Sequence, residues 1–339
     1  MFYCEDDFIY DTQWGSVDQN VSNFDSRLQS KWKNALENGY FRYCLNIAHT
    51  RILPGKYSFL VQLNVDRHAN RRAPEEITCI SQPFDAKKFN FRKVKEEEYL
   101  FEIKNTSAVN SSGHFLIINV SPLEYGHSLL VPSLHSCLTQ IVTLESLQLL
   151  IEVLLLSNSP ALRVGFNGLC AFASVNHLHY HLYYLQQRML LEHIAVEHLS
   201  GPCYQLLNYP APGFVFQLPE NRSVACLSRA VYHLTSYLQD SNIPHNIYVT
   251  RGSRFNSSDA VYNTVRIYIW ARKPSGAIKE LDAFNPALCE LFGHFIIKTE
   301  AEYWKVTEEG VSAVLSDICL ESFTNVRENI KQLFEDYSM

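Results

Sequence analysis

Three histidines at alternating positions are the residues of this chain best suited to chemistry. His177, His179 and His181 lie in a segment otherwise rich in apolar and aromatic residues. A period of two is the repeat of a β-strand, and the aromatic and β-branched neighbours favour a strand as well. The sequence therefore predicts a strand with all three imidazoles on one face and Leu178 and Tyr180 on the other.

Three imidazoles on one strand face allow three interpretations. The strand could be incidentally rich in histidine, or it could hold zinc, which binds neutral imidazole nitrogens. One histidine could instead act as a nucleophile while its neighbours fix its tautomer and meet the developing charge. The preceding Asn167-Gly168 and the small residues around Ser174 favour the nucleophile. They suit a loop that wraps phosphate oxygens with backbone N–H groups and a hydroxyl, which a metal site would not need.

Two blocks of the chain resemble the histidine triad superfamily of nucleotide hydrolases and transferases. One is the Ser-Val-x-His-x-His-x-His run of residues 174–181, and the other is residues 118–132, which contain Asn119 and Gly126-His127. The closer resemblance is to the GDP-hexose phosphorylase family. The segments that carry it are residues 54–57, 62–64, 70–72, 82–85, 88–91 and 171–179.

The resemblance implies a reaction and a set of roles. His179, the central histidine, would attack the α-phosphorus of a GDP-hexose, expected to be GDP-D-glucose with GDP-L-galactose as the alternative. Hexose 1-phosphate would leave a guanylyl-histidine, and inorganic phosphate would then release GDP. The supporting roles implied are orientation of His179 by His177, donors to phosphate oxygens from His181 and Ser174, support of the phosphate loop by Asn167, and ribose binding by Asn119.

Two further segments could bind substrate. Residues 64–74 form the densest basic cluster, which is either a solvated loop or a clamp on phosphates; Arg71 and Arg72 are equal candidates for the clamp. Residues 82–85 and 89–91 combine aromatic rings with amides, as an ordinary structural loop or a base-binding segment would. The resemblance favours guanine recognition there, with Phe84 and Asn90 as candidates.

Two departures from the related families bear on the reaction. His181 stands where uridylyltransferases and plant phosphorylases have Gln, and a proton-donating group there could favour water as the acceptor. A histidine triad hydrolase that releases GMP is therefore the alternative function. Cys170 stands where a small Gly is usual and could narrow the loop. We expect no metal and no cofactor, since side-chain and backbone donors can stabilise the charge.

Composition limits the partners. The 339 residues carry a formal net charge of -6, which argues against a general nucleic-acid-binding surface. The longest apolar run is interrupted by Glu152 and is too short for a membrane span. Nine cysteines without a CxxC pair, and no visible N-terminal signal, predict a cytoplasmic protein. A homodimer is possible.

The pattern of elements predicts an α+β fold with a histidine-triad-like antiparallel sheet and packed helices. We expect a polar lead-in at residues 1–24, a catalytic half at 25–208 and a second half at 209–339, with the boundary at the Pro- and Gly-rich residues 209–213. The second half would be a degenerate copy of the first, as in galactose-1-phosphate uridylyltransferases. The expected helices are residues 24–39, 143–158, 228–239, 307–318 and 326–334, and the expected strands include 114–120, 127–132, 246–251 and 265–272.

Overall fold

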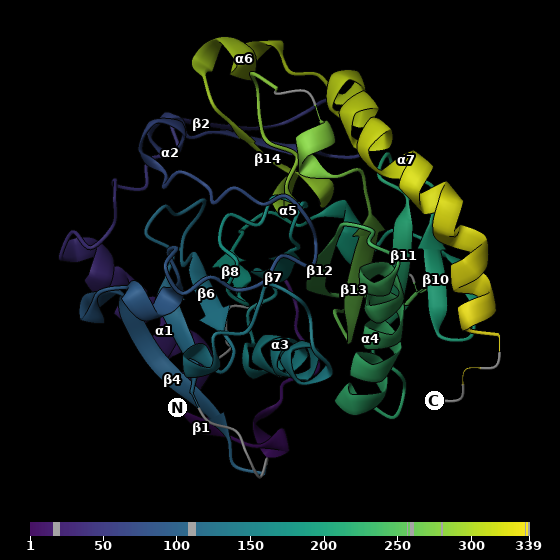
Figure 1. Cartoon of the computed structure of the whole chain (residues 1–339), viewed down its shortest axis with the longest axis horizontal. Coiled ribbons are helices and arrows are strands. Elements are labelled where there is room, and N and C mark those ends of the chain that lie inside the picture. The colour runs from purple at the N-terminus through teal and green to yellow at the C-terminus, as the bar shows by residue number, and fades with distance from the viewer. Residues whose placement is uncertain are drawn as a thin grey trace.

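The computed structural model describes residues 1–15, 21–107, 113–255, 257, 261–278, 281–335 and 337. Within these residues the chain has a mixed α+β fold, as the sequence predicts, built on an 11-stranded sheet and a separate 3-stranded sheet. Figure 1 shows the large sheet crossing the molecule, with helices α3 (Leu144–Leu156) and α4 (Val224–Asp240) side by side on one of its faces. None of the described helices is long and apolar enough to cross a lipid bilayer.

The strands of the large sheet are antiparallel except at one edge, where the first strand is parallel to its neighbour. In spatial order they are β1 (Phe2–Tyr3), β4 (Tyr99–Asn105), β5 (His114–Ile118), β6 (Ser128–Val131), β8 (Tyr180–Tyr184), β7 (Leu162–Asn167), β12 (His245–Gly252), β13 (Thr264–Ala271), β11 (Gly213–Gln217), β10 (Cys203–Leu206) and β9 (Glu197–Ser200). The small sheet has the order β14 (His294–Ile297), β3 (Leu60–Leu63), β2 (His49–Ile52).

The remaining helices connect the strands or cover the sheet. The α-helices are α1 (Asn23–Glu37), α2 (Val65–Asn70), α5 (Leu288–Leu291), α6 (Glu300–Lys305) and α7 (Glu308–Leu333), and the short 3₁₀ helices are η1 (Glu5–Asp7), η2 (Phe91–Lys93), η3 (Glu96–Glu98), η4 (Leu134–Ser136), η5 (Leu190–Glu192) and η6 (Ser275–Ala277). The two helices predicted at 307–318 and 326–334 are one continuous helix, α7, and that prediction is wrong. Val311, Leu315 and Ile330 keep one apolar stripe buried along its length, so no break is needed.

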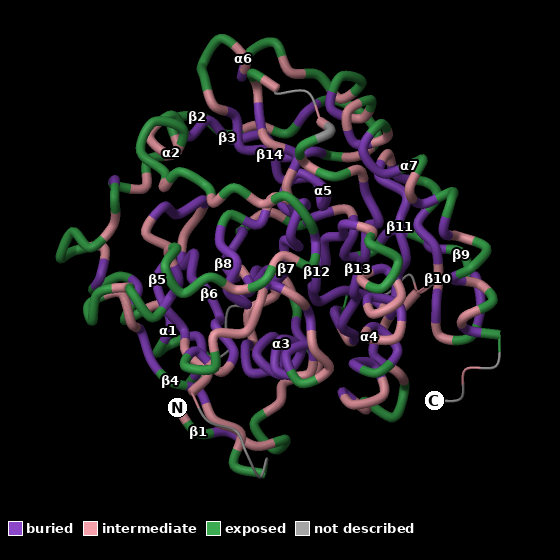
Figure 2. Tube along the Cα trace, in the orientation of Figure 1, coloured by how far each residue is buried: buried purple, intermediate pink, exposed green. Residues whose placement is uncertain are grey.

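The core lies on both faces of the large sheet (Figure 2). One apolar cluster joins α3 and α4 to the sheet; α3 supplies a nearly continuous run of buried leucines and begins at Thr143, whose hydroxyl accepts from Ser146 N at 3.2 Å. A second cluster joins the opposite face to the small sheet, α5 and α7. The helix predicted at 143–158 is thus confirmed, with a stripe too broad for a surface helix.

The two halves of the chain meet at the pairing of β7 with β12. These strands are antiparallel, with Gly165 opposite Tyr248, and every residue of both strands is buried. A Cβ atom on Gly165 would lie 2.5 Å from the carbonyl oxygen of Ile247 and 2.3 Å from Leu288 Cδ2. The backbone at this position therefore approaches its neighbours too closely for any side chain.

We expect Gly165→Ala to lower the free energy of unfolding by about 2 kcal/mol or more, because a backbone carbonyl cannot yield to the added methyl group. Gly276→Ala is the matched control, since its Cβ atom would meet nothing within 4 Å. Urea denaturation of both variants measures the effect. Equal stability of the two variants would contradict the packing described at β7.

Candidate active site

One cavity gathers most of the residues singled out in the sequence. It is lined by residues of both sheets and of helices α2 and α5. Seven of the predicted site residues line it: Asn119, Asn167, Arg71, Arg72, Ser174, His179 and His181.

The histidine strand is shorter than predicted. Strand β8 begins at Tyr180, so His181 lies in it while His177 and His179 precede it. The rings of His179 and His181 line the cavity with centroids 5.2 Å apart. The chain bends through residues 175–177, and the His177 ring packs against Phe91 at 5.5 Å, outside the cavity lining. The His179 ring packs against the same Phe91 at 4.9 Å, so the prediction of one face for all three imidazoles stays a prediction for His177. The intervening Leu178 and Tyr180 point into the core as expected.

Gln140, which the sequence did not single out, fixes the backbone around His179. Its buried side chain accepts from His179 N at 2.8 Å and donates to the carbonyls of His179, at 3.1 Å, and Asn167, at 2.9 Å. Its own N–H donates to Asn176 Oδ1 at 3.0 Å. The Gln140 amide thus satisfies the backbone groups of His179, which has no strand pairing, and connects His179 to the end of β7.

His179 has the tautomer of a nucleophile. Its Nδ1 lies 2.8 Å from the carbonyl oxygen of His177, which can only accept, so Nδ1 carries the hydrogen. Burial lowers the pKa of His179 to about 4 despite this hydrogen bond. The ring is therefore neutral near pH 7, and its Nε2 carries an unshared electron pair at the cavity. The group of His177 that contacts and orients the His179 ring is thus its backbone carbonyl.

His181 has the opposite tautomer, and His127 fixes it. Leu123 N donates to His127 Nδ1 at 2.9 Å, and burial keeps the pKa of His127 well below its usual value, so the hydrogen of the neutral ring is on Nε2. His127 Nε2 lies 3.1 Å from His181 Nδ1 and 3.2 Å from the amide nitrogen of Asn119, which cannot accept. His181 Nδ1 is therefore the acceptor, and its own hydrogen is on Nε2, where it can donate into the cavity.

The loop before the histidines is held from both halves of the chain. Asn167 Oδ1 accepts from Asn246 Nδ2 at 2.8 Å and from Leu288 N at 3.0 Å. Asn246 also donates to the carbonyl of Ala171 at 2.9 Å. Ser174, at the end of the loop, is exposed and lines the cavity. A hydroxyl from this anchored loop thus lines the same cavity as His179.

One side of the cavity is basic. Arg72 lies over the ring of Phe89, 3.3 Å from its centroid, and burial lowers its pKa to about 10, so it remains charged at neutral pH. Arg67 donates to the carbonyl of Ser121. The basic side chains that line the cavity include Arg67, Arg71, Arg72 and Lys298. Fixed positive charge of this kind suits a ligand with several phosphate oxygens.

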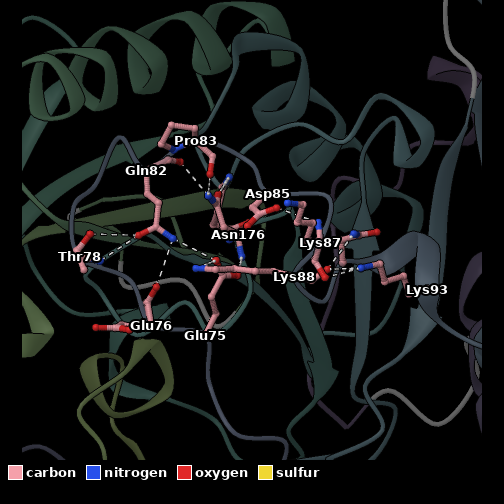
Figure 3. A network of polar contacts seen from close by, with 12 residues as sticks. Glu75, Glu76, Thr78, Gln82, Pro83, Asp85, Lys87, Lys88, Lys93 and Asn176 are labelled. Carbon is pink, nitrogen blue, oxygen red and sulfur yellow. Dashed lines mark hydrogen bonds and ion pairs between the residues drawn. The ribbon is translucent and has the colours of Figure 1, made fainter.

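Phe84 and Asn90 lie outside the cavity lining. The Asn90 side chain accepts from Arg92 N at 3.2 Å and caps η2, while the Phe84 ring meets the edge of His177 at 5.6 Å. Figure 3 shows why the segment is held in place: Asn176 donates to the carbonyls of Gln82 and Pro83, at 2.8 and 3.0 Å. The amides of this segment are thus used in the fold, and the structure does not bring them to the cavity.

Sequence reasoning missed the contribution of the second half to the cavity. Asn285, Glu290, Phe292 and Lys298 all line it. Burial raises the pKa of Glu290 to about 7, so this carboxyl group can donate or accept near neutral pH. The Gly293-His294 dipeptide beside them repeats Gly126-His127 of the first half, but nothing in such a dipeptide indicates which neighbours face a ligand. Among the described residues, no group of three or more His, Cys, Asp or Glu could hold a metal ion.

The fold has a solved counterpart. The structure of yeast Ap4A phosphorylase Apa2 in complex with Ap4A aligns with a TM-score of 0.60 over 88% of this chain and 97% of its own, at 16% identity. The chain therefore shares the fold of that protein over most of its length.

Sequence comparison defines the family. The family model described as "GDPGP1-like, N-terminal domain" matches residues 23–183, and its C-terminal counterpart matches residues 186–337. Proteins named GDP-D-glucose phosphorylase 1 are 40% identical in Danio rerio, over 97% of this chain and 96% of the relative, and 42% identical in Homo sapiens, over 87% and 79%. Arabidopsis thaliana GDP-L-galactose phosphorylase 2 is 32% identical over 93% and 77%. The chain belongs to the GDPGP1-like family, and the family predicted from the sequence is confirmed.

We expect ¹H–¹⁵N correlation spectra of the imidazoles to show opposite tautomers, with the hydrogen on Nδ1 in His179 and on Nε2 in His181. In His127→Phe the donor to His181 Nδ1 is lost, so His181 should become a mixture of tautomers while His179 is unchanged. An Nδ1-protonated His181 in the unaltered protein would contradict the hydrogen-bond assignment.

We expect the free energy of unfolding to fall as the pH is lowered from about 6.5 towards 4. Burial lowers the pKa values of His177, His179 and His245 to about 4, whereas an unfolded histidine titrates near 6.5. In this window the unfolded chain binds more protons, so stability rises with pH. His245→Gln should reduce the slope by up to about 1.4 kcal/mol per pH unit. Urea denaturation between pH 5 and 7 tests this, and a flat profile would contradict it.

Proposed function

We propose that this protein catalyses the phosphorolysis of GDP-D-glucose to GDP and glucose 1-phosphate through a guanylyl-histidine intermediate. The observation that carries the proposal is the pair of opposite tautomers at the cavity: an unshared electron pair on His179 Nε2 beside an N–H donor on His181. The names of the relatives supply the substrate: GDP-D-glucose in the animal proteins, GDP-L-galactose in the plant ones.

In the first step His179 Nε2 attacks the α-phosphorus of the nucleotide sugar. The N–P bond forms as the bond to the bridging oxygen breaks, and its electrons leave with glucose 1-phosphate. The ring becomes positively charged on bonding to phosphorus, and its Nδ1–H already points to the His177 carbonyl, which stabilises this charge. His181 Nε2–H and the Ser174 hydroxyl donate to the non-bridging oxygens, where negative charge increases.

In the second step inorganic phosphate attacks the same phosphorus from the side that glucose 1-phosphate has left. The new P–O bond gives GDP, and the electrons of the N–P bond return to His179 Nε2. The cations that line the cavity, Arg67, Arg71, Arg72 and Lys298, support this step because two anions must approach each other. Asn119, next to His127 at the end of β5, remains the candidate for the ribose hydroxyls.

The second half is proposed to be a degenerate copy of the first. Each half contains two strands, a helix and two strands in the same order along the chain: β5, β6, α3, β7, β8 and β10, β11, α4, β12, β13. The spatial order within the sheet also matches, as β5-β6-β8-β7 and β10-β11-β13-β12. The segment of the second unit that corresponds to β8 is β13, which carries no histidine. The division near residue 209, a homodimer and a cytoplasmic location stay predictions.

The reaction is tested with isotope-labelled inorganic phosphate and GDP-D-glucose. We expect the label to enter the β-phosphate of GDP, since the incoming phosphate becomes that group, with one glucose 1-phosphate released per GDP. Product analysis by chromatography and mass spectrometry measures both. Exclusive formation of GMP would mean that water is the acceptor and would sink the phosphorylase proposal.

The intermediate is tested with a variant of the nucleophile. His179→Ala should lose turnover by roughly three orders of magnitude or more, because no other group replaces the attacking nitrogen. His198→Ala is the matched control, since that histidine is exposed on β9 and does not line the cavity. Enzyme quenched without phosphate should carry an acid-labile guanylyl group at residue 179. An active His179→Ala variant would exclude this mechanism.

A further inference from the structure

The cavity has an apolar wall that begins beside the nucleophile. The ring of Phe91 lies 4.9 Å from that of His179, edge to face. Ile117, Leu129 and Val175 belong to the same apolar cluster, and Val94 packs against it. All five of these residues line the cavity. A wall of this kind suits the flat, weakly polar face of a purine far better than a hexose, whose surface is covered with hydroxyl groups.

Glu98 brings a carboxylate to this part of the cavity. It ends η3, directly before β4, is half-buried and lines the same cavity as Phe91 and Val94. Its Oε1 accepts from Lys95 N at 3.2 Å, which uses only one of the several acceptor positions of this carboxylate. The carboxylate therefore keeps accepting capacity that the fold does not use.

Arg72 shows on which side of the cavity Glu98 lies. The Glu98 carboxylate opposes the lowering of the pKa of Arg72 by burial, so the two charges are close enough to interact. Arg72 belongs to the basic side proposed to hold the phosphates, and Phe91 adjoins the nucleophile. Glu98 thus lines the cavity together with the apolar wall and interacts with Arg72 on the side proposed to hold the phosphates, a position that suits a group contacting the base of a bound nucleotide.

We propose that Glu98 recognises guanine by accepting hydrogen bonds from its N1–H and 2-amino groups. This inference rests on the proposed function and names the residue that selects the base. Guanine presents those two donors side by side, which matches the two oxygens of a carboxylate. Adenine presents an acceptor at N1, so the lone pair of N1 would face the carboxylate and the two groups would repel each other. Hypoxanthine keeps N1–H and lacks the 2-amino group, so it should lose only part of the interaction.

Binding of free nucleotides tests this inference without requiring turnover. Isothermal titration calorimetry with GDP, IDP and ADP is compared between the unaltered protein and Glu98→Gln. The unaltered protein should prefer GDP over IDP by about tenfold and over ADP by about 100-fold or more. In Glu98→Gln both preferences should fall to within about threefold, because the amide offers one donor and one acceptor, which also fit adenine.

The substitution is designed to leave the fold intact. The Gln side chain keeps the oxygen that accepts from Lys95 N, and Glu97→Gln, on the same turn and exposed, is the matched control and should keep both preferences. Should Glu98→Gln fail to fold, Glu98→Asp shortens the carboxylate and should weaken GDP binding while the order of the three nucleotides is kept.

Unchanged preferences in Glu98→Gln would overturn the role of Glu98. A failure of the base-recognition inference can be distinguished from a failure of the proposed function. If the unaltered protein binds GDP selectively but does not release glucose 1-phosphate from GDP-D-glucose, the phosphorylase proposal is wrong and the base-recognition inference stands.

Discussion

The site depends on one buried amide. Gln140 comes from the segment before α3, yet it bonds to both backbone groups of His179, to the end of β7 and to Asn176. Because β8 begins one residue later, His179 has no strand partner of its own, and this side chain takes the place of one. The carbonyl of the bent residue His177 is thereby held against the His179 ring, which fixes the tautomer. A change that displaced the Gln140 amide would disturb the backbone, the ring and the loop together.

Both halves of the chain are required to complete the cavity. The histidines come from the first half, while the second half contributes Glu290 from α5 and Lys298 directly after β14. Asn246 and Leu288 hold Asn167 in place, so the second half also shapes the loop that precedes His179. The second half of the chain therefore lines part of the cavity and supports the loop at its edge.

Local pattern was enough to predict the elements and part of the site. The alternation that sends Leu178 and Tyr180 into the core, and the broad stripe of α3, follow from periodicity alone. The bend at His177 could not be predicted, because a period of two continues through the sequence while Gln140 and the carbonyl contacts decide where the strand begins. Asn90 caps η2 and lies outside the cavity lining, and the sequence could not indicate this because an amide in a loop suits a cap and a ligand alike.

The contacts that escaped sequence analysis are the ones that join distant parts of the chain. Lys298 and Arg67 line the same cavity, and His127, directly before β6, contacts His181 on the neighbouring strand β8, but each pair is separated by many residues along the chain. Phe84 resembled a base-binding ring because aromatic residues beside amides are common in such sites. The Asn176 network instead attaches its segment to the loop of the histidines. Long-range geometry of this kind is set by the sheet order, which no single segment encodes.

The parallel pairing of β3 with β14 has a consequence for how the protein acquires activity. His294 pairs with Leu60 and Ile297 with Leu63, so the small sheet joins an early segment to a late one. During synthesis on the ribosome, the edge of β3 that faces β14 stays unpaired until β14 is made. In the small sheet, β2 pairs with the other edge of β3, and β14 is the strand that pairs with this one. The nascent polypeptide thus carries its histidines long before it has an enclosed pocket. Pairing between strands so far apart in the chain favours slow folding, and a strand edge that stays unpaired favours aggregation until it is covered.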